Sequence, residues 1–463
     1  MRGKAKEKIA LLLLIGLAVF FLGSPVLITE SHQVGMNDCI EFTKAYTAHD
    51  AILLDGNEEM IAQADAEEWP GNGTEAAPYI ISGYYFDAVQ HCIEIRNIDL
   101  HWVITDNEFD GPPVPNVWCG VEISDSKNGI FTNNLVHNRY RGLWLIDIYN
   151  VVISNNIIED NPLHGMECIG FINACVISDN IIRKNQASGI RLLKGIDSEI
   201  SGNHISDCDG TGIQIMSTVM NCEITDNIVE SVTGLGIHLG PSTEVSIMHN
   251  RLTNISSDGI YVLESDNLEM YNNSVENGYE NGIVVRKCRF GLVHNNTING
   301  TDGIGLKIVS GGNSTFRLNR VENATDYGLI TAAEAENMTI TRNVFINNGE
   351  MKQVCDDGVN NEFIYNYYDD WASPDMDSNQ IVDEPYVLDG DAENEDPYPL
   401  ANPNAIPPPP ETTNTTTTST TTSAITTKET EQTGLQIPLG LIEIGAGVIV
   451  LVTVSLFFLK RKS

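Results

Sequence analysis

Asparagine recurs at an almost fixed interval through most of this 463-residue chain. The interval is 22 to 24 residues, apart from a first step of 27. Periods in this range are typical of leucine-rich repeats and of parallel β-helices. The periodic asparagines are Asn107, Asn134, Asn156, Asn180, Asn203, Asn227, Asn250, Asn273, Asn296, Asn319, Asn343 and Asn366. Glycines keep step with them at Gly120, Gly142, Gly165, Gly189, Gly212, Gly236, Gly259, Gly282, Gly303 and Gly328.

The residues between these markers alternate with a period of two, as β-strands do. Apolar residues stand two positions after and three positions before each periodic Asn, for example Ile182 and Ile177 around Asn180. No helical period fills the second half of a unit, which excludes leucine-rich repeats. The pattern therefore predicts an all-β, right-handed parallel β-helix of about 11 or 12 coils of ~23 residues. We expect a short helix over 57–67 at its N-terminal end.

Two consequences of this fold can be predicted from the repeat. Coils stacked about 4.8 Å apart would let each Asn amide bond the amides above and below it, which forms a buried ladder. The periodic glycines are predicted to occupy a corner of the coil that requires positive φ.

The two ends of the chain predict where the protein resides. Basic residues precede an apolar run at 9–21, which is typical of a secretory signal peptide over 1–30. An apolar segment at 438–459 is long enough to cross a bilayer, and the basic tail 460–463 that follows it should be cytoplasmic. Between them we expect a cap and entry segment (31–90), the β-helix (91–366), an acidic closing segment (367–403) and a Pro/Thr-rich stalk (404–437). The predicted protein is a single-pass cell-surface protein with an extracellular ectodomain.

The formal net charge is −37. Such an acidic chain is a poor partner for nucleic acid or for an anionic membrane surface.

Two stretches outside the regular coils resemble a known group of proteins. "WPGNGTEAAPYIISGYYF" (69–86) resembles the segment that opens many such helices, and "NEFIYNYYDDWASPDMDSNQIVDEPY" (361–386) resembles the segment that closes them. The chain is thus similar to NosD-type periplasmic copper-binding proteins and to carbohydrate-binding and sugar-hydrolase β-helices. The resemblance implies the fold, but members of this fold include lyases, hydrolases, epimerases, adhesins and cofactor-maturation proteins.

The closing segment has the spacing of a calcium-binding loop. Asp375, Asp377, Asn379 and Asp383, with the carbonyl of Ile381, occupy the alternate positions from which oxygens surround Ca²⁺. The sixth position, usually Gly, is Gln380, and no Glu stands at the twelfth. A structural Ca²⁺ site and a merely acidic turn both remain open.

A candidate binding face follows from the position two residues after each glycine, which should point outward. When Cys92 is counted as the glycine equivalent of the first coil, this column reads Glu94, Glu122, Trp144, Glu167, Arg191, Gln214, His238 and Tyr261, and then Val284, Gly305 and Ile330. An exposed Trp between carboxylates suits stacking on a sugar ring whose hydroxyls the acids bind. We predict a solvent-facing strip that binds an extracellular glycan or a polymer of similar repeat.

The potential glycosylation sites favour the same half of the molecule. N-x-S/T sequons occur at Asn72, Asn254, Asn272, Asn295, Asn299, Asn313, Asn323, Asn337 and Asn414. None falls between 75 and 253. Glycans on these residues would leave the N-terminal half of the helix bare.

Two other functions compete with binding. A polysaccharide hydrolase or lyase would use Glu122, Glu167, His164 and Arg191 as catalytic candidates, although the paired aspartates of polygalacturonases are missing. Copper handling is disfavoured, because Cys168, Cys175 and Cys222 fall at inward positions and no His-x-His cluster occurs.

Overall fold

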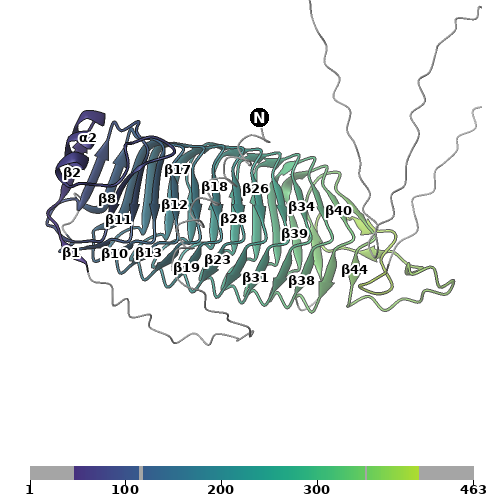
Figure 1. Ribbon diagram of the computed structural model, residues 1–463. Helices are drawn as coiled ribbons and strands as arrows, with labels where there is room; N and C mark the ends of the chain where they lie inside the picture. Colours follow the sequence, from purple (N-terminus) through teal and green to yellow (C-terminus); the bar gives the residue numbers. More distant parts are fainter. Residues whose placement is uncertain (1–45, 114–117, 350–351, 406–463) are drawn as a thin grey trace, which may run out of the picture. The chain divides into compact units, whose positions relative to one another are not determined.

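The computed structural model describes residues 46–113, 118–349 and 352–405. These residues wind into a parallel β-helix whose coils stack in one direction, from α2 (Asn57–Ala66) to the closing segment (Figure 1). Each regular coil contributes a strand to each of three sheets, and every strand pairs in parallel with the coil before and the coil after it.

Sheet 1 contains the strands that follow the periodic glycines. They are β2 (Ile52–Asp55), β5 (Ile93–Arg96), β8 (Cys119–Ser124), β11 (Arg141–Tyr149), β14 (Met166–Asn173), β17 (Ile190–Ile196), β20 (Ile213–Ile215), β21 (Val219–Met220), β24 (Ile237–Leu239), β25 (Ser242–Thr243), β28 (Ile260–Leu263), β29 (Ser265–Asp266), β32 (Ile283–Arg286), β33 (Cys288–Arg289), β36 (Leu306–Gly312), β39 (Leu329–Glu336) and β42 (Val354–Asp356).

Sheet 2 has 13 strands and precedes the asparagine corner. They are β3 (Tyr79–Ser82), β6 (Trp102–Thr105), β9 (Gly129–Thr132), β12 (Val152–Ser154), β15 (Val176–Ser178), β18 (Glu199–Ser201), β22 (Glu223–Thr225), β26 (Ser246–Met248), β30 (Glu269–Tyr271), β34 (Leu292–His294), β37 (Thr315–Arg317), β40 (Thr339–Thr341) and β43 (Glu362–Ile364).

Sheet 3 has 14 strands and follows that corner. They are β1 (Thr47–Ala48), β4 (Tyr84–Asp87), β7 (Glu108–Asp110), β10 (Leu135–His137), β13 (Ile157–Glu159), β16 (Ile181–Arg183), β19 (His204–Ser206), β23 (Ile228–Glu230), β27 (Arg251–Thr253), β31 (Ser274–Glu276), β35 (Thr297–Asn299), β38 (Arg320–Glu322), β41 (Val344–Ile346) and β44 (Tyr367–Tyr368).

The 13 strands of sheet 2 slightly exceed the 11 or 12 coils expected from the asparagines. The first coil accounts for the difference, because it passes from β3 to β4 through Gly83 alone and has no ladder Asn. Helix α2 is inserted in this coil between β2 and β3, at the place where the sequence predicts a helix. It buries Met60 and Ala64 at the N-terminal end of the core.

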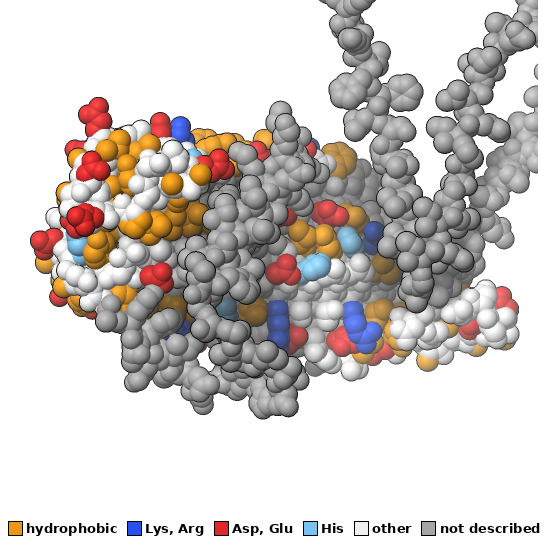
Figure 2. Space-filling model, in the orientation of Figure 1, with side chains coloured by type: hydrophobic (Ala, Val, Ile, Leu, Met, Phe, Trp, Pro, Cys, Tyr) orange, Lys and Arg blue, Asp and Glu red, His pale blue; other side chains and the backbone are white. Residues whose placement is uncertain are grey.

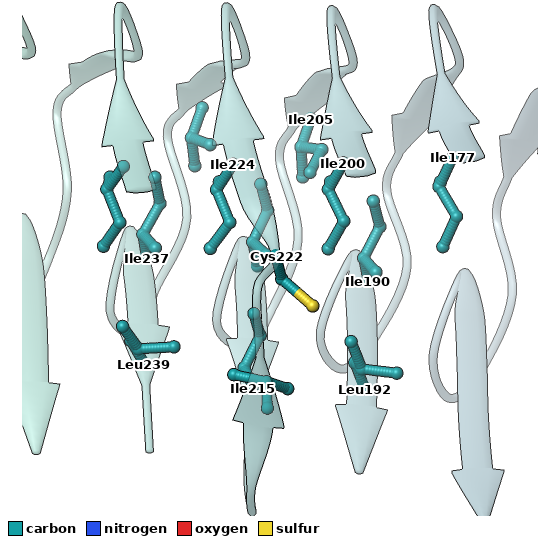
Figure 3. Packing of buried hydrophobic residues seen from close by; sticks show 14 of the residues in the cluster. Ile177, Ile190, Leu192, Ile200, Ile205, Ile215, Cys222, Ile224, Ile237 and Leu239 are labelled. Carbon is teal, nitrogen blue, oxygen red and sulfur yellow. The ribbon is translucent and has the colours of Figure 1, made fainter. Parts of the chain in front are cut away.

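The interior of the coil is a continuous apolar core. Inward residues from successive coils form rows: Ile177, Ile200 and Ile224 lie side by side on neighbouring strands of sheet 2, and Ile205 enters the same core from sheet 3 (Figure 3). All four are at most 3% exposed. This confirms the predicted alternation, because the residues on either side of each isoleucine along its strand are more exposed than the isoleucine.

The predicted asparagine ladder is present along the whole helix. Asn227 shows its unit: its backbone N–H and its Nδ2 both donate to Oδ1 of Asn250 at 3.0 Å, and Nδ2 also donates to the carbonyls of Ile200 and Thr225. The ladder ends where Asn366 donates to the buried carboxylate of Asp396. A carboxylate completes the ladder because it accepts hydrogen bonds without needing a further acceptor.

The prediction that the periodic glycines adopt positive φ is wrong. None of them has positive φ, whereas Asn and Asp residues such as Asn155 and Asp179 take up left-handed turns. The glycines are needed for close packing instead. A Cβ on Gly189 would lie 2.5 Å from Cγ2 of Ile205 and 2.9 Å from the carbonyl oxygen of Gly212 in the next coil.

The C-terminal end of the helix is closed by aromatic and acidic residues. Tyr386, in the short β45 (Tyr386–Val387), stacks on Tyr368 with ring centroids 3.8 Å apart, and it is fully buried. Strand β45 pairs antiparallel with β46 (Glu395–Asp396), which holds the terminal acceptor of the ladder. The open strands of the last coil are thereby covered.

Several predicted segments lie outside the described residues. These are the signal peptide (1–30), the stalk beyond 405 and the transmembrane segment (438–459) with its tail. Among the described residues, no helix is both long enough and apolar enough to cross a membrane.

Candidate functional site

The predicted column lies on consecutive strands of sheet 1. Cross-strand pairs connect Glu94 to Glu122, Glu122 to Trp144, Trp144 to Glu167, and Glu167 to Arg191. The pairs continue through Gln214 and His238 to Tyr261. We call these eight residues the sheet 1 strip.

The prediction of Gly305 as a member of the column is wrong. Tyr261 pairs with Val284, as expected, but Val284 pairs with Lys307, where Gly305 had been predicted. In this coil Gly305, and not Gly303, makes the close contacts with the next coil that the other periodic glycines make. The outward residue two positions after the glycine is therefore 307 and not 305. The strip is therefore followed by Val284, Lys307 and Ile330.

Glu122 is a buried, partly paired carboxylate. It is only 2% exposed, and its Oε1 accepts from Nε and Nη2 of Arg96 at 3.1 and 2.9 Å. Nε2 of His91 lies 3.3 Å from Oε2 without hydrogen-bond alignment. Oε2 is thus buried and has no hydrogen-bond partner among the described residues.

His91 connects Glu122 with a thiol. Its Nδ1 lies 2.9 Å from Sγ of Cys119 and accepts from the Cys119 backbone N–H at 3.3 Å. Burial lowers the pKa of His91 and raises the pKa of the Cys119 thiol well above its usual range. At neutral pH the imidazole and the thiol are therefore both uncharged.

Glu167 is the second buried carboxylate of the strip, at 5% exposure. Arg141 bonds its Oε2 and Arg191 bonds its Oε1, so both oxygens are held by guanidinium groups. His164 Nε2 lies 4.0 Å from Oε1. Burial, reinforced by the two arginines, lowers the pKa of His164 to about 4, although Glu167 opposes this shift.

The expectation that all strip residues face solvent is therefore wrong for Glu122 and Glu167. Side chains from neighbouring coils cover both carboxylates: Arg96 and His91 cover Glu122, and Arg141 and Arg191 cover Glu167. Ionised carboxylates at these depths are stable only when they are paired in this way. Each carboxylate is thus held by basic side chains of neighbouring coils.

Trp144 lies between the two carboxylates and is half-buried. The guanidinium carbon of Arg141 lies 5.1 Å from its ring centroid, which is cation–π distance. Further along, the rings of His238 and Tyr261 lie 5.7 Å apart at a tilt of 53°. Nε1 of Trp144 and Nδ1 of His238 are buried without a hydrogen-bond partner among the described residues.

An apolar surface lies beside the strip on the same sheet. Ile146 and Ile169 pair across β11 and β14, and Phe171 and Met216 are 48% and 38% exposed. Nζ of Lys194 lies 5.0 Å from the ring centroid of Phe171. Sheet 1 therefore presents polar and apolar columns side by side.

Two hollows are present elsewhere on the described surface, and no strip residue lines either. One of 490 Å³ includes Gln90 and Trp118 near the N-terminal end. Another of 720 Å³ includes Glu264, Lys287 and Asn337 in the C-terminal half. On the face shown in Figure 2, the visible acidic side chains are scattered among hydrophobic and uncharged ones.

Two models of known protein families match parts of this chain. A model described as "right handed beta helix region" matches residues 215–368, and a model described as "periplasmic copper-binding protein (NosD)" matches 79–257. The chain is a right-handed parallel β-helix protein. No curated protein sequence matches this β-helix protein.

The likeness to one solved structure supports the same assignment. The A-module of the mannuronan C-5 epimerase AlgE6 from Azotobacter vinelandii superposes with a TM-score of 0.55 at 14% identity, covering 68% of this chain and 96% of the module. The catalytic unit of a GH87 alpha-1,3-glucanase from Streptomyces thermodiastaticus has a TM-score of 0.39 at 15% identity, covering 68% of each chain. At these identities the likeness is one of fold alone.

The copper named in the NosD description can be tested against the donors that the β-helix protein offers. Among the described residues, the one group of three or more His, Cys, Asp or Glu side chains with ligand atoms within 4.8 Å of one another is His91, Cys119 and Glu122. A thiol and an imidazole suit Cu⁺, but a carboxylate does not. Cys168, Cys175 and Cys222 are buried free thiols in the apolar core, at the inward positions that the sequence predicts.

Sequence reasoning missed His91, Cys119 and Arg141. Each stands one residue before the glycine position of its coil, as His164 does, so the four form a second column beside the strip. Their shared position, one residue before the glycine, can be read from the printed sequence. It was overlooked because this position lies at a corner of the coil, where strand alternation does not predict the direction of a side chain.

The acidic closing loop of the β-helix protein folds around its own carboxylates. The Asn379 N–H donates to Asp375 and Asp377 at 3.0 and 3.1 Å, and the Met376 N–H donates to Asp383 at 2.8 Å. Gln380, which replaces the usual glycine, adopts a φ of 73°, the left-handed conformation that the glycine would provide.

The sequons that fall on described residues are accessible. Asn299 is half-buried, and the other seven are exposed: Asn72, Asn254, Asn272, Asn295, Asn313, Asn323 and Asn337. Asn313 and Asn337 border the 720 Å³ hollow. Asn414 lies outside the described residues.

Proposed function

We propose that this protein is a cell-surface β-helix that binds an extended extracellular polysaccharide along the sheet 1 strip. The observation that carries the proposal is the register of the strip: eight polar or aromatic side chains stand one per coil on consecutive strands, and the series ends at Val284. Neighbouring strands lie about 4.8 Å apart, which is of the same order as the repeat of a sugar chain. Successive coils can therefore each contact one ring.

The surroundings of the strip support binding. Trp144, stacked with Arg141, offers a ring for stacking, and Arg191, Gln214 and Tyr261 offer hydrogen-bonding groups. Ile146 and Phe171 extend the contact area with apolar surface. The epimerase module with a similar fold acts, by its name, on mannuronan, which is also a polysaccharide.

A polysaccharide hydrolase or lyase using the same face is the alternative. It is less well supported, because both oxygens of Glu167 are bonded to arginines and Glu122 is bonded to Arg96. Glu94 also pairs with Arg96, at 2.7 Å, although burial raises its pKa. An acid catalyst needs a carboxyl group that can exchange a proton with the substrate.

The predicted signal peptide, stalk and membrane segment complete the proposal. A Pro/Thr-rich stretch at 404–437 would hold the binding face away from the membrane in which 438–459 is anchored. Glycans on the exposed sequons would shield the C-terminal half of the helix and leave the strip accessible.

Trp144→Ala is expected to weaken polysaccharide binding by about 30-fold or more, because stacked aromatics at the centre of an interface often contribute 2 kcal/mol or more. The full-length chain would first be screened on an array of neutral and uronate-containing glycans. Affinities for the best ligand would then be measured for Trp144→Ala and for Tyr279→Ala, a control that removes an exposed aromatic outside the strip.

Equal loss of affinity in the two variants, or no binding to any arrayed glycan, would contradict the proposal. The same ligand also separates a binder from an enzyme. Glu167→Gln should only reduce the affinity of a binder, whereas it should abolish the release of new sugar ends by an enzyme.

We also propose a structural Ca²⁺ ion in the loop of Asp375, Asp377, Asn379 and Asp383. Adding Ca²⁺ should raise the melting temperature by a few degrees, because a ligand at 100 times its Kd stabilises the folded state by about 2.7 kcal/mol. Thermal unfolding of the full-length chain with and without Ca²⁺ checks this. Asp375→Ala should remove the response, and a response that persists in Asp375→Ala would place the ion elsewhere.

A further inference from the structure

His91, Cys119 and Glu122 form a compact cluster of three different donors inside the N-terminal coils. The side chains of His91 and Glu122 are 4% and 2% exposed, and Cys119 is fully buried. His91 stands in the coil before Cys119, and Glu122 follows Cys119 by three residues in β8. The imidazole lies between the thiol and the carboxylate: its Nδ1 is 2.9 Å from Sγ, and its other ring nitrogen, Nε2, is 3.3 Å from Oε2.

A second observation points to a missing partner at this place. Buried carboxylate oxygens in folded proteins almost always accept a hydrogen bond. Oε1 of Glu122 accepts two from Arg96, but Oε2 has none among the described residues although it is buried. Oε2 lies on the side of the carboxylate that faces His91. A cation there would satisfy this oxygen.

We propose that His91, Cys119 and Glu122 bind one Zn²⁺ ion. One imidazole nitrogen, one thiolate and one carboxylate oxygen are the three ligand types that zinc accepts together. Tetrahedral zinc places such atoms about 3.4–3.6 Å apart, and here they lie within 4.8 Å of one another. The imidazole now meets the thiol through Nδ1 and the carboxylate through Nε2, so binding requires the other two ligand atoms to move toward the one ring nitrogen that holds the ion. This assignment does not rest on polysaccharide binding.

The ligands must balance a dication beside Arg96 and Arg139, whose positive charges act on His91. Binding releases the thiol proton of Cys119 to solvent, so that thiolate and carboxylate together balance the two charges of Zn²⁺. Arg96 holds Oε1, and its own charge is also met by Glu94 at 2.7 Å. The Trp118 ring packs edge-on against His91 at 4.8 Å. Gln90 and Trp118 line the 490 Å³ hollow, which brings solvent to the neighbours of the two ligands.

The choice of zinc over Cu⁺ rests on the carboxylate. Soft Cu⁺ favours sulfur and imidazole ligands, whereas a carboxylate oxygen suits harder or borderline ions. The position of Oε2 inside the cluster therefore favours Zn²⁺. Removing that oxygen as a donor should discriminate between the two metals.

The test loads the full-length chain, previously stripped with a chelator, with Zn²⁺ or with Co²⁺ as its spectroscopic substitute. We expect one tightly bound ion per chain and a thiolate-to-cobalt charge-transfer band. Cys119→Ser and His91→Ala should each abolish the band and the tight ion. Cys168→Ser, which removes a buried thiol that is not part of the cluster, should retain both.

Two further variants keep the proposal falsifiable if Cys119→Ser folds poorly. Arg96→Met should weaken Zn²⁺ binding by about 10- to 100-fold, the range found when a group that orients a metal ligand is removed. Glu122→Gln removes a ligand itself and should weaken binding at least as much. A band that survives in Cys119→Ser, affinities that are unchanged in Glu122→Gln, or stoichiometric Cu⁺ binding in preference to Zn²⁺ would overturn the assignment. The cluster would then be a hydrogen-bonded part of the core.

Discussion

Asn227→Ala is expected to lower the free energy of unfolding by about 3–5 kcal/mol, since each buried polar group left without a partner costs about 1–3 kcal/mol. The Asn227 amide donates to Ile200, Thr225 and Asn250. It also accepts from the backbone and the side chain of Asn203. Alanine removes all of these bonds and leaves carbonyl oxygens and an amide unpaired in the core.

The effect should be concentrated near the substituted coil, because each repeat in a solenoid contacts only its neighbours. Chemical denaturation gives the change in free energy, and hydrogen exchange should show the largest loss of protection at Asn203 and Asn227. Asn267→Gly is the control, since it removes an exposed amide at a left-handed turn that glycine adopts easily. If both variants changed stability by less than about 0.5 kcal/mol, as ordinary surface substitutions do, the ladder would have no special role.

Arg139→Met is expected to destabilise the N-terminal coils by about 3–5 kcal/mol, by the same unpaired-group argument. Arg139 is fully buried, and its guanidinium donates to the carbonyls of Ala88, Asp110, Gln90 and Cys119 at 2.5 to 3.4 Å. It therefore ties together the connections of three successive coils. Methionine fills much of the same volume but leaves all four carbonyls without this donor.

Denaturation would be compared for Arg139→Met, Arg139→Lys and Arg183→Met. Arg183 forms an exposed pair with Glu159, so its loss should cost less than about 1 kcal/mol. Lysine keeps the charge but not the planar fork of donors, so Arg139→Lys should recover only part of the stability. Equal stability of the Lys variant and the wild type would mean that charge alone, and not the set of carbonyl contacts, explains the buried arginine.

Much of the strip could be predicted because the helix has a fixed period. Once each coil begins at a glycine or its equivalent, the residue two positions later must lie on the same face of sheet 1 in every coil. This placed Glu94 through Tyr261 correctly, including the coil that begins with β5, where Cys92 replaces the glycine. The one error, Gly305 for Lys307, came from choosing the wrong glycine in a coil that contains two.

The sequence by itself determined the repeat, the inward rows of apolar residues and the buried asparagine ladder, since these depend only on the period of the coil and on the pairing of like residues between neighbours. Only the tertiary structure decided which polar groups meet. His91 and Cys119 are separated by a connection longer than the regular period, and Arg96, Arg141 and Arg191 cover the two glutamates through long side chains from adjacent coils. Periodicity fixes where a backbone position lies, but rotamers and irregular corners fix what its side chain touches. The burial of Glu122 and Glu167, and the clustering of His91, Cys119 and Glu122, follow from those contacts.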